Sequence, residues 1–429
     1  MLGPPPSALY TRLSRETFSA PPLEGAAETD VAVIGGGIGG LAAALALRRA
    51  GIATTLLEAE TIGAGASGRN NGQVIPTLTR HDPAAVLKTM GEARGERFLA
   101  MLQSSADLLF DTAASYAIDC DAARSGWIQP AHTPGRARLA ERRAAQWAAR
   151  GAPAEYLDAP ALAARLGSTA YCGGWRHAGG GHINPLAFAR GLARAAQQEG
   201  ARIHEHSRAR RLVREPDGWR VEAPQGVLRC RKLVVVTAAH TDALWPRLRR
   251  TIVPVTSYQL ATDVLAPTVA ARILPGNEAA SDTRNDLRYF HKDREGRLVT
   301  GGALAIQAVA RPRLERAVRA RLAELFPELA GADFPFFWGG RIAMTTDRLP
   351  RLHRTPDGLI GWIGCNGRGL ALAMGMGAVL RDAVLGARDE DLALAPAPLT
   401  PVPLHPLVRR TARLALIHYR RKDRTEVPL

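Results

Sequence analysis

The chain has 429 residues, more than a single hydrophobic core usually organises, so we expect two interlocked domains. Its four cysteines are scattered and form no Cys-x-x-Cys pair, which argues against a disulfide framework and a zinc site, and we predict no metal site. The net charge of +16 would attract polyanions, but no aromatic-studded basic groove accompanies it, so we expect no nucleic-acid partner.

Residues 1–28 are rich in proline and lack periodicity, and we expect them to form an arm on the surface. The first residues show neither the basic start nor the apolar run of a signal peptide. Together with the scattered cysteines, this favours a cytoplasmic protein.

A strand, a glycine-rich turn and a helix follow one another directly after this arm. Asp30–Ile34 is a short, β-branched run of the kind that a buried parallel strand needs. Gly35, Gly37 and Gly40 then fall at the G-x-G-x-x-G spacing, and strong helix formers continue to Ala50. This succession is typical of a dinucleotide-binding unit.

Each glycine of the motif has a physical role. The first makes the tight turn, the second lets the backbone approach a pyrophosphate, and the third lets helix and strand pack closely. Glu58 ends the second β-branched run, at about the usual spacing of 20 residues, and would accept hydrogen bonds from a ribose. The uncharged run Val31–Leu47 could also be a membrane helix, but its glycines and its strand-like start exclude that.

A polar, glycine-rich loop from Gly63 to Gln73 comes next, where a plain nicotinamide dehydrogenase would enter its next helix. Small residues and side-chain donors are concentrated in it, among them Ser67, Arg69 and Asn70. Backbone N–H groups and these side chains suit the phosphate and ring of a longer cofactor.

Residues 58–73, Glu-Ala-Glu-Thr-Ile-Gly-Ala-Gly-Ala-Ser-Gly-Arg-Asn-Asn-Gly-Gln, resemble the second flavin-contacting stretch of the D-amino-acid-oxidase-like FAD oxidoreductases. Within that family they are most similar to the gamma-glutamylputrescine oxidoreductase branch, whose members typically read Gly-Ala-Ser-Gly-Arg-Asn-Gly-Gly-Gln. Asn71 replaces a glycine of that pattern. The resemblance covers about residues 29–388 and implies FAD as the cofactor.

The resemblance implies an α/β fold. An FAD-binding, Rossmann-like domain of the glutathione-reductase type would be interleaved with an α+β substrate domain built on an antiparallel sheet. The FAD-binding domain would comprise residues 29–80, 176–250 and 338–388. The substrate domain would comprise residues 81–175 and 251–337, and residues 389–429 would form a basic C-terminal tail.

A second glycine-rich loop, Trp175–Pro185, precedes a predicted helix at Leu186–Gln198. The resemblance places this loop near the flavin and the substrate, which makes His182 and Asn184 candidate lining residues. Capping of the helix start explains the same two residues equally well.

The run Lys232–Ala239 is predicted to be another buried strand, with a turn and helix after it at His240–Leu244. In the family this strand returns to the FAD sheet, and its end, at Ala238, lies over the adenine–ribose side. Ala209 lies where the family contacts adenine through its backbone.

From residue 252 to 337 the pattern changes to alternating strands with one helix, Pro312–Phe326. Tyr258–Thr262, Asp282–His291 and Arg297–Gly302 are predicted strands, and a hairpin turn joins the last two. In the family these strands form the substrate sheet above the flavin. The polar groups nearest the pocket would be Tyr258, Asp282, Arg288, Tyr289 and His291, of which alternation lets only every second one face it.

Trp338–Pro350 resembles the stretch that returns to the FAD domain beneath the flavin. A strand at Leu359–Gly364, a turn and a small-residue helix at Leu370–Leu385 then form a second strand–glycine–helix unit. The resemblance directs the positive end of this helix at the flavin edge where negative charge develops on reduction, and Arg368 could add to that field.

Relatives that link the flavin covalently carry a histidine near position 70 or a cysteine near position 340. The residues here are Asn70 and Gly340, so we expect FAD to be bound non-covalently.

The predicted site is drawn from all of these stretches. The predicted cofactor-binding residues are Gly35, Gly37, Ile38, Gly39, Gly40, Glu58, Ala59, Gly65, Ala66, Ser67, Arg69, Asn70, Asn71, Gly72, Gln73, Ala209, Ala238, Arg341, Gly367, Arg368, Gly369 and Leu370. The predicted catalytic groups are Arg368, His291 and Tyr289, and no general base stands out.

The tail, His405–Arg424, is strongly basic, and Leu407, Leu414 and Ile417 could share one helical face. We expect a terminal helix packed on the protein, and a peripheral membrane contact is the alternative.

These features predict an FAD-dependent enzyme that oxidises the C–N bond of an amine or amino acid to an imine, by hydride transfer to flavin N5, with oxygen as acceptor. One alternative passes the electrons to a quinone or protein carrier. Others are a nicotinamide-linked dehydrogenase and a non-enzymatic nucleotide-binding regulator. The sequence leaves the substrate, the acceptor and the oligomeric state open.

Overall fold

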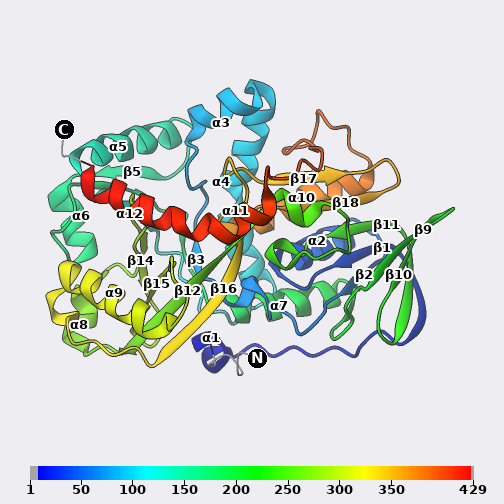
Figure 1. Cartoon of the computed structure of the whole chain (residues 1–429), viewed down its shortest axis with the longest axis horizontal. Helices are drawn as coiled ribbons and strands as arrows, with labels where there is room; N and C mark the ends of the chain where they lie inside the picture. Colours follow the sequence, from blue (N-terminus) through cyan, green and yellow to red (C-terminus); the bar gives the residue numbers. More distant parts are fainter. Residues whose placement is uncertain (1–7, 427–429) are drawn as a thin grey trace.

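The computed structural model describes residues 8–426, and it shows two large sheets with helices packed on and between them (Figure 1). Residues 1–7, the start of the predicted arm, and residues 427–429 lie outside the described part. The helices are α1 (Leu9–Leu13), α2 (Ile38–Arg49), α3 (Pro83–Met90), α4 (Glu92–Ser115), α5 (Pro134–Ala148), α6 (Ala159–Leu166), α7 (Pro185–Gln198), α8 (Pro267–Arg272), α9 (Ala310–Leu325), α10 (Gly369–Leu385), α11 (His405–Thr411) and α12 (Ala415–Thr425), with 3-10 turns η1 (Ala66–Gly68), η2 (Ala238–His240), η3 (Leu248–Thr251), η4 (Pro327–Leu329) and η5 (Ala412–Leu414).

The first sheet is built on a parallel core. Its strands, in spatial order, are β17 (Arg351–Arg354), β18 (Leu359–Ile363), β11 (Gly226–Val235), β1 (Gly25–Ile34), β2 (Thr54–Leu57) and β8 (Arg202–His204), with β9 (Arg211–Glu215) and β10 (Gly218–Glu222) attached to β11 as an antiparallel ribbon. The pairs β18–β11, β11–β1, β1–β2 and β2–β8 are parallel. Parallel strands need both faces covered, and the side chains of β1 show how this is achieved.

Alternate residues of β1 enter two different cores. Val31 and Val33 pack with helices α2, α4, α7 and α10, whereas Ala32 and Ile34 pack on the opposite face with the β9–β10 ribbon and the segment around Trp245. All four of these β1 side chains are buried, which explains the continuous apolar run in the sequence.

The second sheet has the order β16 (Phe336–Met344), β12 (Val253–Val264), β15 (Arg297–Gly302), β14 (Tyr289–Lys292), β13 (Ala279–Ser281), β4 (Trp127–Pro130), β6 (Gly174–His177) and β5 (Ala154–Leu157). Its pairs are antiparallel except for β13 with β4. Helices α6 and α9 supply much of the apolar layer against it. A short antiparallel pair, β3 (Gln73–Val74) with β7 (Gly181–His182), is separate from both sheets. The predicted class, an α/β fold that combines a Rossmann-like sheet with an antiparallel one, is confirmed.

Three local predictions are corrected. Residues 282–288 form a loop rather than a strand, because the Asp282 carboxylate accepts the backbone N–H groups of Arg284 and Arg288 at 3.1 and 2.9 Å and so competes with a ladder. No helix forms at 240–244; Asp242 instead accepts the N–H of Leu244 at 2.9 Å in a turn.

Strand β16 is the third correction. It pairs with β12 along its whole length and is the edge of the second sheet, so Trp338–Met344 does not rejoin the first sheet. The chain returns there only with β17 and β18.

The N-terminal arm is more deeply placed than its composition suggested. Leu9 and Tyr10 of α1 are buried, and the Tyr10 ring meets Trp338 edge-on with centroids 5.4 Å apart. The chain then runs without regular structure to Gly25, where β1 begins five residues earlier than predicted.

Within residues 8–426, none of the helices combines the length and the apolar character needed to cross a membrane.

Candidate functional site

One cleft, of about 730 Å³, runs from the carboxyl ends of the first sheet to the face of the second. The residues just after β1, β2, β11 and β18 line one end of it, and residues of β12, β14 and β16 line the other. Ligands bind in open α/β sheets outside the carboxyl ends of the strands, so the position of this cleft is the one that the fold favours.

The glycine-rich turn after β1 forms a bare cradle at one end of this cleft. Gly36, Gly37 and Gly39 line it without a side chain, and it opens onto the N-terminus of α2, whose first N–H groups have no partner within the helix. A Cβ atom on Gly37 would lie 2.8 Å from the Ser67 hydroxyl. A pyrophosphate, which needs close backbone approach and N–H donors, fits this cradle.

Gly40 has a different function. A Cβ atom there would lie 1.9 Å from the carbonyl oxygen of Gly35, so only glycine lets α2 pass this close to the end of β1. Gly40 does not line the cleft. Its position fits the role that the motif spacing predicts for the third glycine, which is to let helix and strand pack closely.

Glu58 lies at the end of β2, beside the cradle. One carboxylate oxygen accepts the N–H of Gly36 at 2.6 Å and the other accepts the N–H of Glu60 at 2.9 Å. Burial raises the pKa of Glu58, and these N–H donors oppose that rise. The carboxylate therefore fixes the turn and retains lone pairs that a ribose could use.

Most predicted cofactor-binding residues lie together in this cleft, although they are far apart in the sequence. Those that line it are Gly35, Gly37, Ile38, Gly39, Glu58, Ala59, Gly65, Ala66, Ser67, Arg69, Asn70, Asn71, Gln73, Ala209, Ala238, Arg341, Gly367, Arg368, Gly369 and Leu370. Gly40 and Gly72 do not, and Gly72 instead packs where a Cβ atom would meet the carbonyl oxygen of Ile183 at 2.4 Å.

The side chains of the loop at 63–73 stabilise the loop itself. Asn70 accepts the N–H of Gly72 at 2.8 Å and donates to the carbonyl oxygen of Ser67 at 2.7 Å. Asn71 accepts the N–H of Gln73 at 3.1 Å. The carboxamide oxygens of both asparagines are used to set the loop, which leaves its backbone and the Asn71 amide nitrogen to meet a ligand.

Arg368 caps the N-terminus of α10 and is buried in the cleft. It donates to the Thr77 hydroxyl at 2.6 Å and lies over the Trp127 ring at 4.6 Å. Burial, reinforced by the charge of Arg143, lowers the pKa of Arg368 to about 9, so the group remains a cation at neutral pH. A buried cation at a helix N-terminus is a strong site for negative charge.

Tyr289 lines the cleft from β14 and donates from its hydroxyl to Gln259 at 2.9 Å. Burial raises its pKa to about 12, so it is a neutral hydrogen-bonding group. Tyr258, Asp282 and Arg288, which the sequence also placed near the pocket, are not among the residues that line the cleft.

His291 is corrected as well, because it does not line the cleft. Its ring nitrogens lie 2.6 Å from the carbonyl oxygen of Asn71 and 2.8 Å from that of Lys292, and its ring stacks on His182 at 4.6 Å. Burial lowers the pKa of His291. This buried ring supports the loop at Asn71 from behind and is not among the residues that line the cleft.

His182 and Asn184 lie outside the cleft too. Asn184 is the N-cap of α7 and accepts the N–H of Ala187 at 3.1 Å, as capping predicted. His182 stacks on His291 and lies 3.1 Å from the carbonyl oxygen of Asn277.

Sequence reasoning missed a row of cleft residues on β12. Val253, Val255, Ser257 and Gln259 all face the cleft, at the spacing of two that a strand imposes. Side chains of a strand alternate between its two faces, so the alternation along β12 could have identified Ser257 and Gln259 once one cleft-facing residue was known. The same alternation turns Tyr258 away from the cleft. His240, Arg80 and Arg348 also line the cleft and carry no motif that marks them.

The C-terminal tail lines the cleft as well, which no pattern in the sequence indicated. Its residues in the cleft are Val408, Ala412, Arg413, Ala415, Leu416 and Tyr419. The tail therefore covers the end of the cleft that lies against the second sheet.

Comparisons with known proteins agree with this geometry. Residues 30–383 match the family described as "FAD dependent oxidoreductase" (DAO), and the chain belongs to that family. It is thus a flavoenzyme: the bare cradle, the second glycine turn before α10 and the volume of the cleft fit FAD, and FAD is its cofactor.

Several individual members of the family are similar to this chain over most of its length. The chain is 31% identical to a probable oxidoreductase OrdL of Rhizobium meliloti, over 86% of each protein, and 29% identical to the gamma-glutamylputrescine oxidoreductase of Escherichia coli, over 87% of this chain and 88% of that one. Among solved structures, glycine oxidase from Geobacillus kaustophilus superposes with a TM-score of 0.72 at 21% identity, covering 87% of this chain and 99% of that one. The predicted resemblance is confirmed.

Asn70 and Gly340 line the cleft, and neither residue offers a side chain that can form a covalent link to FAD, in keeping with the prediction that FAD is held without a covalent bond. Cys365 is the single cysteine of the chain in the cleft, and burial raises the pKa of its thiol, so it is a poor nucleophile. Acid precipitation should release the yellow chromophore into the supernatant. Colour that stays with the pellet would contradict this, and the Cys365→Ser variant would then show whether the thiol is the link.

Replacing Glu58 with alanine should weaken FAD binding. The loss of one or two hydrogen bonds to the ribose costs about 1–3 kcal/mol, or roughly 5- to 150-fold in Kd. Titration of the apoprotein with FAD, followed by flavin fluorescence, measures it. Glu24→Ala is the control, since Glu24 is exposed, lies outside the cleft, and its side chain accepts no hydrogen bond from the described residues. Equal affinity in both variants would mean that Glu58 does not hold the cofactor.

Proposed function

We propose that this enzyme oxidises the C–N bond of a small amine or amino acid to an imine, which water then hydrolyses, with oxygen as the electron acceptor. The activities named for its relatives support the substrate class: gamma-glutamylputrescine oxidoreductase among the curated relatives, and glycine oxidase, L-proline dehydrogenase and L-amino acid deaminase among the solved structures. The scattered cysteines support a cytoplasmic location.

The observation that carries the proposal is the chemistry of the cleft at the second sheet. Among residues 8–426 the carboxylates in the cleft are Glu58, Glu60, Asp242 and Asp286. The first two lie beside the cradle, Asp242 is exposed and lies 3.7 Å from Arg208, and Asp286 accepts hydrogen bonds from Arg321 at 2.6 Å and Arg420 at 2.7 Å. No free carboxylate is therefore left as a base at that end, and oxidation of an already neutral amine needs none.

When bound, FAD supplies the two-electron oxidation itself. The residues of the chain bind and orient. Tyr289 and Gln259 present a neutral hydroxyl and amide that can orient an amine, and the tail covers the cleft and limits water. Arg368, a buried cation in the cleft, would stabilise the negative charge that the cofactor gains on reduction.

Arginine predominates among the charged groups towards the second sheet and the tail. Arg80, Arg348 and Arg413 line the cleft there, and Asp286, which lines it among residues 8–426 at the same end, is already paired with arginines. A substrate that carries a carboxylate, such as an amino acid or a glutamyl amide, is complementary to this field, whereas a simple polyamine is not.

Anaerobic stopped-flow reduction of the flavin tests the proposal. Amines with a carboxylate, such as gamma-glutamylputrescine, sarcosine, glycine and L-proline, should bleach the flavin, and the rate should rise with pH through the pKa of the bound amine, because an ammonium cannot be oxidised readily. Admission of oxygen should then restore the colour with formation of hydrogen peroxide. Bleaching by a 2-hydroxy acid and by none of the amines would refute the substrate class; recovery of colour with a quinone but not with oxygen would refute the acceptor.

A further inference from the structure

The C-terminal tail has an inner face against the protein and an outer face that is exposed. Helices α11 and α12 and the turn between them cross the front of the molecule in Figure 1. The side towards the protein carries the cleft residues Val408, Leu416 and Tyr419. The predicted packed helix is therefore present, but Leu407, Leu414 and Ile417, the residues expected on its packed face, do not make that contact.

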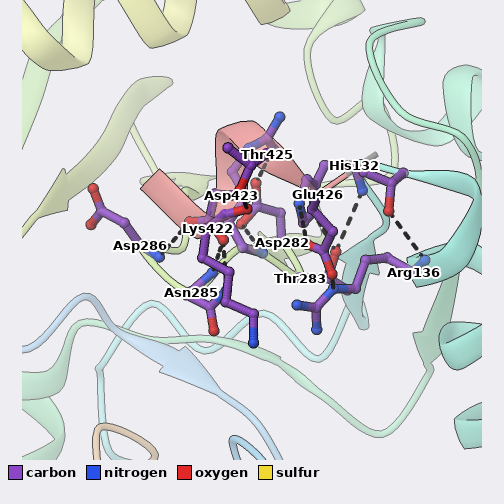
Figure 2. Close-up of polar contacts among 12 residues, drawn as sticks. His132, Arg136, Asp282, Thr283, Asn285, Asp286, Lys422, Asp423, Thr425 and Glu426 are labelled. Carbon is purple, nitrogen blue, oxygen red and sulfur yellow. Dashed lines mark hydrogen bonds and ion pairs between the residues drawn. The ribbon is translucent and has the colours of Figure 1, made fainter. Parts of the chain in front are cut away.

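Specific polar contacts hold the tail in place from end to end. His405 lies with Nε2 3.0 Å from the carbonyl oxygen of Ile252, and Arg420 donates to Asp286 at 2.7 Å. Asp423 accepts the N–H groups of Asn285 and Asp286, each at 2.9 Å (Figure 2). Because these contacts fix the inner face of the tail against the protein, they also fix which residues of the tail point outward.

The last anchor joins Glu426 to Arg136 at 2.8 Å and to His132 at 3.3 Å (Figure 2). His132, Asp423 and Glu426 also bring three potential metal ligands within 4.8 Å of one another. Both carboxylates already accept N–H groups of the protein, and Arg136 supplies a positive charge, so an ion pair accounts for the cluster.

The outer face of the tail is apolar and exposed. Leu404, Leu407, Leu414 and Ile417 are 74%, 56%, 49% and 57% exposed, and they make up four of the nine large apolar side chains that are exposed among residues 8–426. Isolated exposed apolar residues are normal, but a concentration on one short segment marks an interaction surface.

Unpaired cations accompany these apolar side chains along the tail. Besides Arg413, which lines the cleft, Arg409, Arg410, Arg421, Lys422 and Arg424 are exposed, and none has an acidic partner at ion-pair distance within the described part of the chain. Many other arginines of the protein are paired, so the tail holds a local excess of free positive charge.

We infer that this outer face, defined by Leu404, Leu407, Leu414 and Ile417 with the cations around them, docks on an anionic lipid bilayer. Helices of this kind lie in the membrane interface, with leucine and isoleucine side chains below the headgroups and arginines at the phosphates. The same face on a second copy of this chain would bring like charges together, which disfavours self-association through it. The contact is peripheral, with no described helix crossing the membrane.

Docking would place the substrate end of the cleft at the membrane surface, because the same segment covers that end. The inference does not depend on the substrate or the electron acceptor, and its test needs no turnover.

Flotation of the full-length, FAD-loaded enzyme with vesicles tests it. We expect binding to vesicles of equal parts phosphatidylglycerol and phosphatidylcholine, little binding to pure phosphatidylcholine, and release by high salt. Each cation near an anionic surface strengthens partitioning roughly fivefold, so the triple variant Arg410→Gln/Arg421→Gln/Arg424→Gln should bind roughly 100-fold more weakly. The double variant Leu414→Ser/Ile417→Ser should also bind more weakly.

Arg211→Gln/Arg249→Gln/Arg316→Gln is the matched control, because it removes three exposed, unpaired arginines that lie outside the tail. It should bind as the parent enzyme does. Equal loss in both triple variants would show that net charge, not the tail, drives binding, and would overturn the inference. Absence of lipid binding would overturn it too, as would a concentration-dependent dimer that the Leu414→Ser/Ile417→Ser variant dissociates.

Discussion

Replacing Gly40 with alanine is expected to abolish FAD binding and to destabilise the protein more than any other single methyl group added in the cradle. The added Cβ atom would lie 1.9 Å from the carbonyl oxygen of Gly35 and 3.4 Å from Val33. The clash is with backbone, so β1 and the start of α2 must move apart. We expect a loss of about 3 kcal/mol or more in the free energy of unfolding, together with loss of bound flavin.

Two further glycine-to-alanine variants show whether the effect is specific to Gly40. In Gly37→Ala the new methyl group would meet the Ser67 hydroxyl at 2.8 Å, and a side chain can rotate away, so a smaller loss is expected. Gly331→Ala is the control, because a Cβ atom there meets nothing within 4 Å and its backbone angle is ordinary. Thermal melting and the flavin-to-protein ratio of each variant give the two readouts. If Gly40→Ala bound FAD and melted like Gly331→Ala, the first strand–turn–helix unit would not be the cofactor cradle.

Local physics explains why this cradle could be read from the sequence. A strand of β-branched residues, a turn that must contain glycine and a helix of good helix formers are each set by neighbours in the chain. The same holds for the second unit at β18 and α10. The fold is confirmed where a few consecutive residues determine the backbone conformation, as in these two strand–turn–helix units.

Long-range packing explains the failures. His291 was assigned to the pocket because of its strand, but its ring is buried against the back of the loop at Asn71. When both faces of a strand are buried, the neighbouring residues in the sequence do not show which face lines the pocket. The tail is a second case: only the folded chain reveals that Leu416 and Tyr419, more than 300 residues from Ser67 and Asn70, line the same cleft.

Replacing Arg368 with methionine is expected to slow flavin reduction by a factor on the order of 10²–10³ while leaving FAD bound. Methionine keeps the apolar bulk over Trp127 and removes the cation. Loss of one preorganised donor or charge at a site of developing negative charge typically costs that much. FAD binding should persist, because the contacts of Arg368 are with Thr77 and Trp127, and the pyrophosphate cradle at Gly36 and Gly37 uses neither of them.

Removal of the Arg368 charge should affect the flavin midpoint potential, kcat and KM differently, and each can be measured separately. Without the cation the reduced, more negative flavin is less stable, so the midpoint potential should fall and kcat should fall with it, whereas KM should change little. Arg368→Lys keeps the charge but cannot reproduce both the contact with Thr77 and the planar stack on Trp127, so it should recover part of the rate. Thr77→Val, which removes the hydroxyl partner and leaves the charge in place, should lower the rate by less than tenfold. An unchanged midpoint potential in Arg368→Met would mean that this buried arginine serves packing at the start of α10 and does not stabilise the reduced cofactor.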